Sequence, residues 1–206
     1  DPSDSAKSTA AKLAEVANAL YLGEPADDTT VAVMKVREKQ TVSIMFGPPS
    51  DPKEDIPVTE KFLATDGIKI VSGGTTSKIV SRYLGQEVVT RLDYIDPKIP
   101  PVGSMEGVDL VSEGVLTLGH VMEMSNMIVS KTNTDLSWLK KKDGASLIAQ
   151  YLFEYATDVN FFVGRAMNPA HQNPNLPLDL SIKLKIVEVL SKNLELMGKR
   201  VNVEYH

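Results

Sequence analysis

The sequence predicts a doubly wound, three-layer α/β/α domain with a mostly parallel sheet, preceded by a helix–strand arm. Two observations carry this prediction. After residue 40, short and almost continuously apolar segments alternate with amphipathic helical ones, as in a parallel sheet covered by helices on both faces. Most of these apolar segments also run into a turn that contains glycine. The predicted boundaries are therefore 1–40 for the arm and 41–206 for the α/β domain.

Composition narrows the classes of function. The chain has 206 residues, with 22 basic and 27 acidic side chains, a net charge of −5 and no cysteine. A mildly acidic chain without a basic block argues against nucleic acid as a partner. The absence of cysteine excludes disulfides and thiolate zinc sites and fits a reducing compartment. No apolar run approaches the ~20 residues of a membrane helix, and no signal peptide is evident. We expect a cytoplasmic protein.

The arm begins with a helical pattern over 4–22, where apolar residues recur at helical spacing. Gly23 and Pro25 are expected to end this helix. The segment 31–36 is rich in valine, which predicts a strand.

The α/β domain then follows a regular order of strand, turn and helix. The prolines of 97–101 and 167–177 predict irregular loops. The expected strands cover 41–46, 68–71, 87–92, 108–111, 159–163 and 201–205. The expected helices cover 55–64, 77–84, 115–127, 144–156 and 180–197.

The turn Gly73-Gly74-Thr75-Thr76 is the leading candidate site, because ligands of open parallel sheets bind beyond the carboxyl ends of the strands. Its glycines let the backbone approach a ligand and adopt positive φ. Thr75 or Thr76 is expected to cap the following helix, whose free N–H groups favour an anion. The alternative is a purely structural turn, since the motif matches neither a Walker loop nor the dinucleotide fingerprint.

Further polar residues follow other predicted strands. Glu113, beside Gly114, is a candidate base or a ligand for a sugar hydroxyl or a metal ion, and Arg165 is a candidate partner for a phosphate or a carboxylate. Asn168 and His171 lie in the loop after the 159–163 strand, where His171 is a candidate catalytic group. Each of these residues also has an interpretation without a ligand. In that interpretation Glu113 is a lone carboxylate, Arg165 is an ordinary surface arginine, and Asn168 and His171 only stabilise their loop.

The segment Gly23-Glu24-Pro25-Ala26-Asp27-Asp28-Thr29-Thr30-Val31-Ala32-Val33 resembles the end of metal-dependent serine/threonine phosphatases of the stage II sporulation protein E family, which are bacterial hydrolases. In that family an Asp-Asp-x-Thr motif closes the phosphatase module. The resemblance implies that Asp27 helps to hold Mn²⁺ or Mg²⁺. It also implies further metal ligands upstream of Asp1, so no catalytic residue of that module is assigned to this chain.

The remainder of the chain is similar to the extra domain that follows this module in some anaerobic bacteria. The resemblance rests on four segments, which are Gly73-Gly74-Thr75-Thr76, 106–111, 113–117 and 168–174. It implies that the chain is the carboxy-terminal part of a protein phosphatase.

Three hypotheses about function follow. The first is a regulatory or ligand-binding region that holds a small anionic or phosphorylated ligand at its strand-to-helix turns. The second is an independent enzyme that acts on a phosphorylated small molecule through Glu113 and His171. The third is a dimerisation module, with a homodimer as the assembly.

Overall fold

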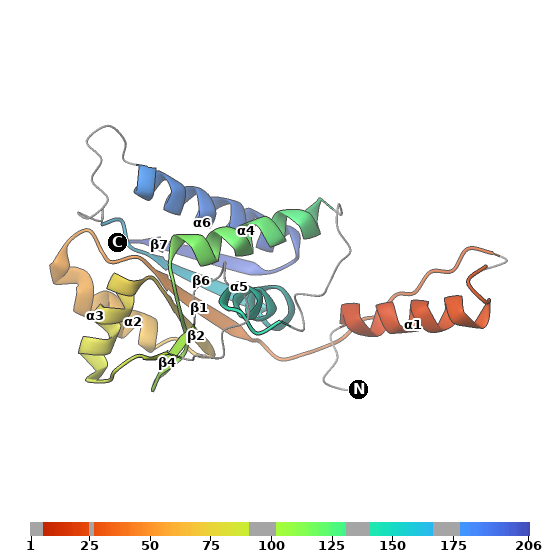
Figure 1. Cartoon of the computed structure of the whole chain (residues 1–206), viewed down its shortest axis with the longest axis horizontal. Coiled ribbons are helices and arrows are strands. Elements are labelled where there is room, and N and C mark those ends of the chain that lie inside the picture. The colour runs from red at the N-terminus through yellow and green to blue at the C-terminus, as the bar shows by residue number, and fades with distance from the viewer. Residues whose placement is uncertain (1–5, 25–26, 91–101, 131–140, 167–177) are drawn as a thin grey trace. The chain divides into compact units, whose positions relative to one another are not determined.

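The computed structural model describes residues 6–24, 27–90, 102–130, 141–166 and 178–206. Its internal contacts divide the chain into two units, Asp1–Glu38 and Lys39–His206, and each is described by itself (Figure 1).

In the first unit, the predicted helix is present as α1 (Ala6–Leu20). It ends where Leu22 adopts a left-handed φ of 55° and Gly23 follows at 82°. The Gly23 N–H donates to the carbonyl oxygen of Asn18 at 2.9 Å, which closes the helix in the manner of a Schellman motif.

The strand predicted at 31–36 is wrong. Residues 28–40 form no strand, and the side chains of Met34 and Val36 are both 92% exposed. A strand needs a neighbour that accepts and donates its backbone hydrogen bonds. Among the described residues, no strand of the sheet pairs with this segment, so its β-forming residues do not become a strand.

The second unit is built on a seven-stranded sheet in the order β3-β4-β5-β2-β1-β6-β7. Strands β5, β2, β1, β6 and β7 are mutually parallel, whereas β3 and β4 form an antiparallel edge. The strand bounds are β1 Thr41–Phe46, β2 Ile68–Ser72, β3 Val89–Thr90, β4 Gly103–Met105, β5 Val108–Ser112, β6 Asp158–Val163 and β7 Arg200–Tyr205.

The order of the parallel strands makes the fold doubly wound. From β1 the chain proceeds outward through β2 to β5, and then returns to the other side of β1 to add β6 and β7. The direction reverses between β1 and β6. Sheets of this type bind ligands beyond the carboxyl ends of their strands, and this reversal is their usual binding crevice.

Helices cover both faces of the sheet, which gives the predicted three layers (Figure 1). Helices α4, α5 and α6 pack on one face, and α2 and α3 pack on the other. The bounds are η1 Pro52–Glu54, α2 Asp55–Leu63, α3 Gly74–Leu84, α4 Val115–Val129, α5 Gly144–Ala149, the π-helix η3 Gln150–Tyr155, and α6 Leu178–Leu196.

The central strand β1 shows why two cores form. Val42, Ile44 and Phe46 point to the core beneath α4, α5 and α6, whereas Met45 points to the core beneath α2 and α3. Alternate residues of a strand face opposite sides of a sheet, so an uninterrupted apolar strand serves both. Each fully buried side chain of this size contributes about 1.5–3 kcal/mol.

Some predicted bounds differ from the observed ones. Strand β4 was not expected, and β3 is shorter than the predicted 87–92, of which 91–92 lie outside the described residues. The predicted helix over 144–156 is α5 followed by a π-helical segment. Helix α3 begins at Gly74 rather than at Ser77, which matters for the candidate site.

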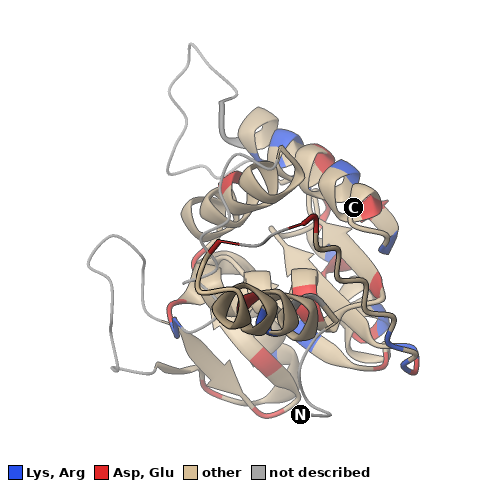
Figure 2. Cartoon of the chain, turned by 90° about the vertical axis from the view of Figure 1, so that its right-hand side faces the viewer, with Lys and Arg blue, Asp and Glu red and all other residues tan. Residues whose placement is uncertain are grey.

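Two further properties concern the surface. No helix in the described part of the chain is long and apolar enough to cross a membrane. Acidic and basic residues are interspersed over the helices and strands in view in Figure 2.

Candidate functional site

The four turns that follow the parallel strands β1, β2, β5 and β6 lie at one edge of the sheet, because parallel strands end on the same side. Their closest backbone approaches are made in two pairs. The turns after β1 and β6 pack against each other, and so do the turns after β2 and β5.

The pair after β1 and β6 fills the crevice where the strand order reverses. A Cβ built on Gly164 would lie only 2.0 Å from the carbonyl oxygen of Pro48, so the two backbones are in direct contact. Lys183 of α6 is 6% exposed, and its Nζ donates to the Gly164 carbonyl oxygen at 2.9 Å. The same Nζ lies 5.8 Å from the centre of the Phe46 ring. The chain itself therefore occupies the usual binding crevice.

The pair after β2 and β5 is joined by hydrogen bonds. The Gly73 N–H donates to the Ser112 carbonyl oxygen at 2.9 Å, and Ser72 Oγ donates to the Glu113 carbonyl oxygen at 2.9 Å. A Cβ built on Gly114 would lie 3.3 Å from Cα of Gly73. Since Gly73 and Gly114 are the residues that precede α3 and α4, the N-termini of these two helices converge.

The amino end of α3 has no side-chain cap. Its N-cap residue is Gly73, with φ 113° and ψ 136°, a conformation that only glycine adopts readily. The predicted capping by Thr75 or Thr76 is wrong, because both residues already lie inside the helix. The first backbone bond of the helix runs from the Ser77 N–H to the Gly73 carbonyl oxygen at 2.9 Å. The N–H groups before Ser77 therefore lack acceptors within the helix.

The surroundings of this helix end are open on one side and polar on the other. A Cβ built on Gly74 meets no atom within 4 Å, and Thr75 is exposed. Thr76 is fully buried, and its Oγ1 has no hydrogen-bond partner among the described residues. That oxygen lies 3.3 Å from the position of a Cβ on Gly73, so it faces the turn. An unmet buried hydroxyl costs about 1–3 kcal/mol.

The amino end of α4 differs, because a carboxylate of the chain occupies it. Glu113 Oε2 accepts hydrogen bonds from the N–H groups of Leu116 at 3.0 Å and Thr117 at 3.4 Å. A carboxylate at this position also interacts favourably with the helix dipole. Two adjacent helix ends thus offer the same anion-binding chemistry, and Glu113 satisfies only one of them.

No family model, curated protein or solved structure matches this chain. Any function of the site therefore has to be inferred from its geometry and from the chemistry of its residues.

The structure brings together only part of the predicted site. The predicted residues Gly73, Gly74, Thr75, Thr76, Glu113 and Gly114 all lie on the paired turns after β2 and β5. Arg165 belongs to the other pair of turns, where its N–H donates to the His206 carbonyl oxygen at 2.7 Å and its side chain is exposed. Asn168 and His171 lie outside the described residues.

Asp27 does not form a metal site with the residues described. Its Oδ1 accepts the backbone N–H of Asp28 at 2.8 Å, and both residues are exposed. Within the described ranges, no group of three or more His, Asp or Glu side chains is placed to hold a metal ion. Mn²⁺ or Mg²⁺ needs several oxygen ligands, so these two carboxylates alone do not fit such an ion.

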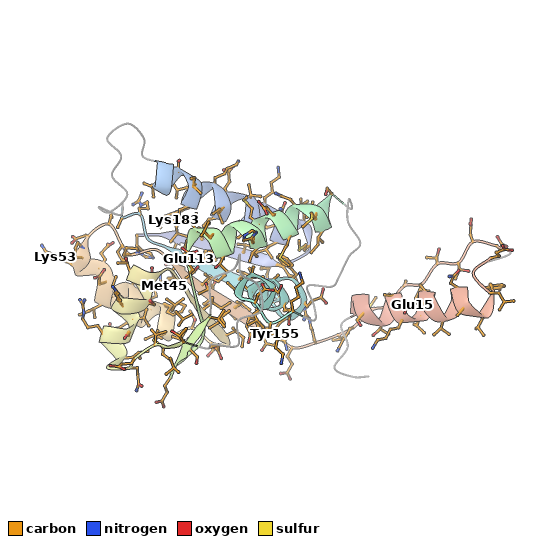
Figure 3. All side chains as sticks on the ribbon, viewed as in Figure 1. Glu15, Met45, Lys53, Glu113, Tyr155 and Lys183 are labelled. Carbon is orange, nitrogen blue, oxygen red and sulfur yellow. The ribbon has the colours of Figure 1, made fainter. Side chains whose placement is uncertain are left out.

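Sequence reasoning missed Lys183. Its side chain is buried where the turns after β1 and β6 meet. Figure 3 shows Lys183 and Glu113 at the same end of the sheet. The buried residues of α6 follow helical spacing and are Lys183, Ile186, Val187, Leu190, Asn193 and Leu194. Ile182, the apolar residue just before Lys183, is 42% exposed. Lys183 lies three and four residues before Ile186 and Val187, and this helical spacing could have predicted that the lysine is buried.

Proposed function

We propose that residues 39–206 form a ligand-binding domain that holds a small anion, phosphate or a phosphorylated molecule, at the amino end of α3. The observation that carries this proposal is the uncapped helix end between Gly73 and Thr76, open at Gly74 and lined by an unpartnered buried hydroxyl. Backbone N–H groups and the helix dipole favour negative charge there.

The proposal extends to the parent protein. The resemblance of 23–33 to the end of a sporulation protein E-type phosphatase suggests that the ligand-binding domain regulates or targets a bacterial, cytoplasmic serine/threonine phosphatase. Mn²⁺ or Mg²⁺ would belong to that module, with Asp27 as one ligand among others supplied by it.

Among the alternatives, an independent enzyme that uses Glu113 and His171 has less support. One oxygen of Glu113 is already engaged with the N–H groups of α4, and His171 lies outside the described residues. For a dimerisation module, no observation in the described residues selects a contact surface.

Titration of the ¹⁵N-labelled protein with inorganic phosphate, followed by NMR, tests the site. We expect saturable shifts of the Gly74, Thr75 and Thr76 amide signals. Gly74→Val should weaken binding about tenfold or more, because its side chain stands where the anion must approach, and a charge-assisted hydrogen bond contributes about 1.5–3 kcal/mol.

Gly119→Val is the matched control. A Cβ built on Gly119, within α4, also meets no atom within 4 Å, so both variants should fold, and Gly119→Val should bind phosphate normally. The proposal would be abandoned if phosphate left the three amide signals unchanged, or if both variants bound it as the wild type does.

A further inference from the structure

We infer that the ligand carries a hydroxyl group close to its phosphate, and that Glu113 accepts a hydrogen bond from this hydroxyl. The inference rests on the proposed anion site at α3 and assigns the class of ligand, a phosphomonoester of a polyol.

Glu113 is fixed beside the anion site from two directions. Its carbonyl oxygen accepts the hydroxyl of Ser72, the residue before the Gly73 N-cap, at 2.9 Å. Its neighbour Ser112 accepts the Gly73 N–H at 2.9 Å. On the other side, Oε2 is held by the N–H groups at the start of α4. The Glu113 backbone is therefore held beside the turn at Gly73, and its carboxylate is held at the amino end of α4, whose N-cap Gly114 is packed against Gly73.

The second oxygen of this carboxylate is available. Among the described residues, the hydrogen bonds to the Glu113 side chain all go to Oε2, and the side chain is half-buried rather than enclosed. A carboxylate has acceptor capacity on both oxygens, so Oε1 can take a donor from a ligand.

Electrostatics then favours a donor on the ligand. Two negative charges about 4 Å apart repel by ~4 kcal/mol at an effective dielectric constant of 20. Where a phosphate at α3 comes this close to the Glu113 carboxylate, a hydrogen-bond donor or a cation between them offsets the repulsion. A ligand with a hydroxyl near its ester bond supplies that donor.

A hydroxyl fits better than a cation. An ammonium group is favoured by a full carboxylate charge, and the amino end of α4 already offsets part of the Glu113 charge. A metal ion needs further carboxylates, and no group of three metal-ligating side chains is present in the described residues. A neutral donor satisfies Oε1 without either requirement.

The test compares three esters by isothermal titration calorimetry with the full chain. Glycerol 3-phosphate carries the hydroxyls, n-propyl phosphate has the same carbon chain without them, and phosphoethanolamine carries an ammonium group instead. We expect glycerol 3-phosphate to bind about tenfold more tightly than the other two, as a hydrogen bond to a charged acceptor provides. In Glu113→Gln this preference should fall to about twofold or less.

Glu123→Gln is the matched control, since Glu123 lies further along α4, where its Oε2 is 3.5 Å from Nδ1 of His120. It should keep the tenfold preference. Equal binding of glycerol 3-phosphate and n-propyl phosphate would overturn the inference and leave the proposed anion site standing. Tighter binding of phosphoethanolamine would also overturn it. If none of the esters binds, the proposed function fails first.

Discussion

At the scale of single residues, the closest backbone contact described at the site edge is at Gly164. A Cβ at this position would lie 2.0 Å from the Pro48 carbonyl oxygen and 2.3 Å from that of Gly47. Gly164→Ala should therefore lower the free energy of unfolding by about 1–3 kcal/mol or more, measured by urea denaturation. Gly119→Ala, in open space on α4, should be neutral or stabilising. Equal stability of the two variants would contradict the packing described.

A comparison of two buried threonines, Thr76 and Thr59, tests whether the Thr76 hydroxyl binds the ligand. Thr76 and Thr59 are both fully buried, and the Oγ1 of each has no partner among the described residues. Replacement by the isosteric valine should leave stability unchanged or raise it by up to about 1 kcal/mol, because an unmet polar group is removed. Phosphate affinity should fall about tenfold only in Thr76→Val, whereas loss of affinity in Thr59→Val as well would indicate an indirect effect.

At the scale of elements, the two converging helices differ in what accepts the free N–H groups at their amino ends. The amino end of α4 is capped by Glu113, and that of α3 begins at a glycine without a side-chain cap. Local sequence explains the difference, because a glutamate precedes Gly114 whereas Ser72 precedes Gly73. The Ser72 hydroxyl is directed to the neighbouring turn instead.

The pairing of β6 with the edge strand β7 should depend on pH through Asp158. Its carboxyl is 16% exposed and bonds the Arg200 guanidinium, with Oδ1 2.9 Å from Nε and Oδ2 3.1 Å from Nη2. Desolvation raises the pKa of Asp158, but hydrogen bonds from Thr157 and Arg200 and the charges of Arg200 and Lys39 outweigh it, so the pKa is lowered. This contribution to stability is thus present above the unfolded pKa of about 3.9 and lost as the pH falls toward the folded value.

Asp158→Asn should therefore cost about 1 kcal/mol at neutral pH and less at a pH below the unfolded pKa of about 3.9. Urea denaturation of both proteins at the two pH values measures the difference. A gap in stability that stayed constant, or that widened in acid, would show that the ion pair does not stabilise the strand pair.

At the scale of the whole molecule, both hydrophobic cores lie within 39–206, so this unit holds its entire sheet and its own helices. Expressed alone, residues 39–206 should unfold cooperatively, with a Tm within about 2 °C of that of the full chain. Differential scanning calorimetry of the two proteins provides the measurement. A markedly lower Tm for the shorter chain would mean that 1–38 contributes to the stability of the domain.

Much of the domain could be predicted because its information is local. The apolar runs of β1, β2, β5 and β6 and the helical spacing of α6 are visible in the sequence, as is the alternation that specifies a layered α/β fold. The glycine turn after β2 was also recognisable, since Gly73-Gly74 follows an apolar strand directly. In contrast, the start of α3 was misplaced, because Gly74, Thr75 and Thr76 are weak helix formers that the surrounding packing holds in a helix.

Hydrophobic periodicity and glycine placement act over a few residues, so the class of fold and the position of the turn at 73–76 can be predicted from the sequence alone. Strand order depends on contacts between distant segments, so the folded chain is needed to show which turns meet. Folding placed Lys183 in the crevice between β1 and β6 and left the turns after β2 and β5 as the candidate site. It also left 31–36 without a partner strand among the described residues, because a β-forming segment becomes a strand only when a neighbour supplies its hydrogen bonds.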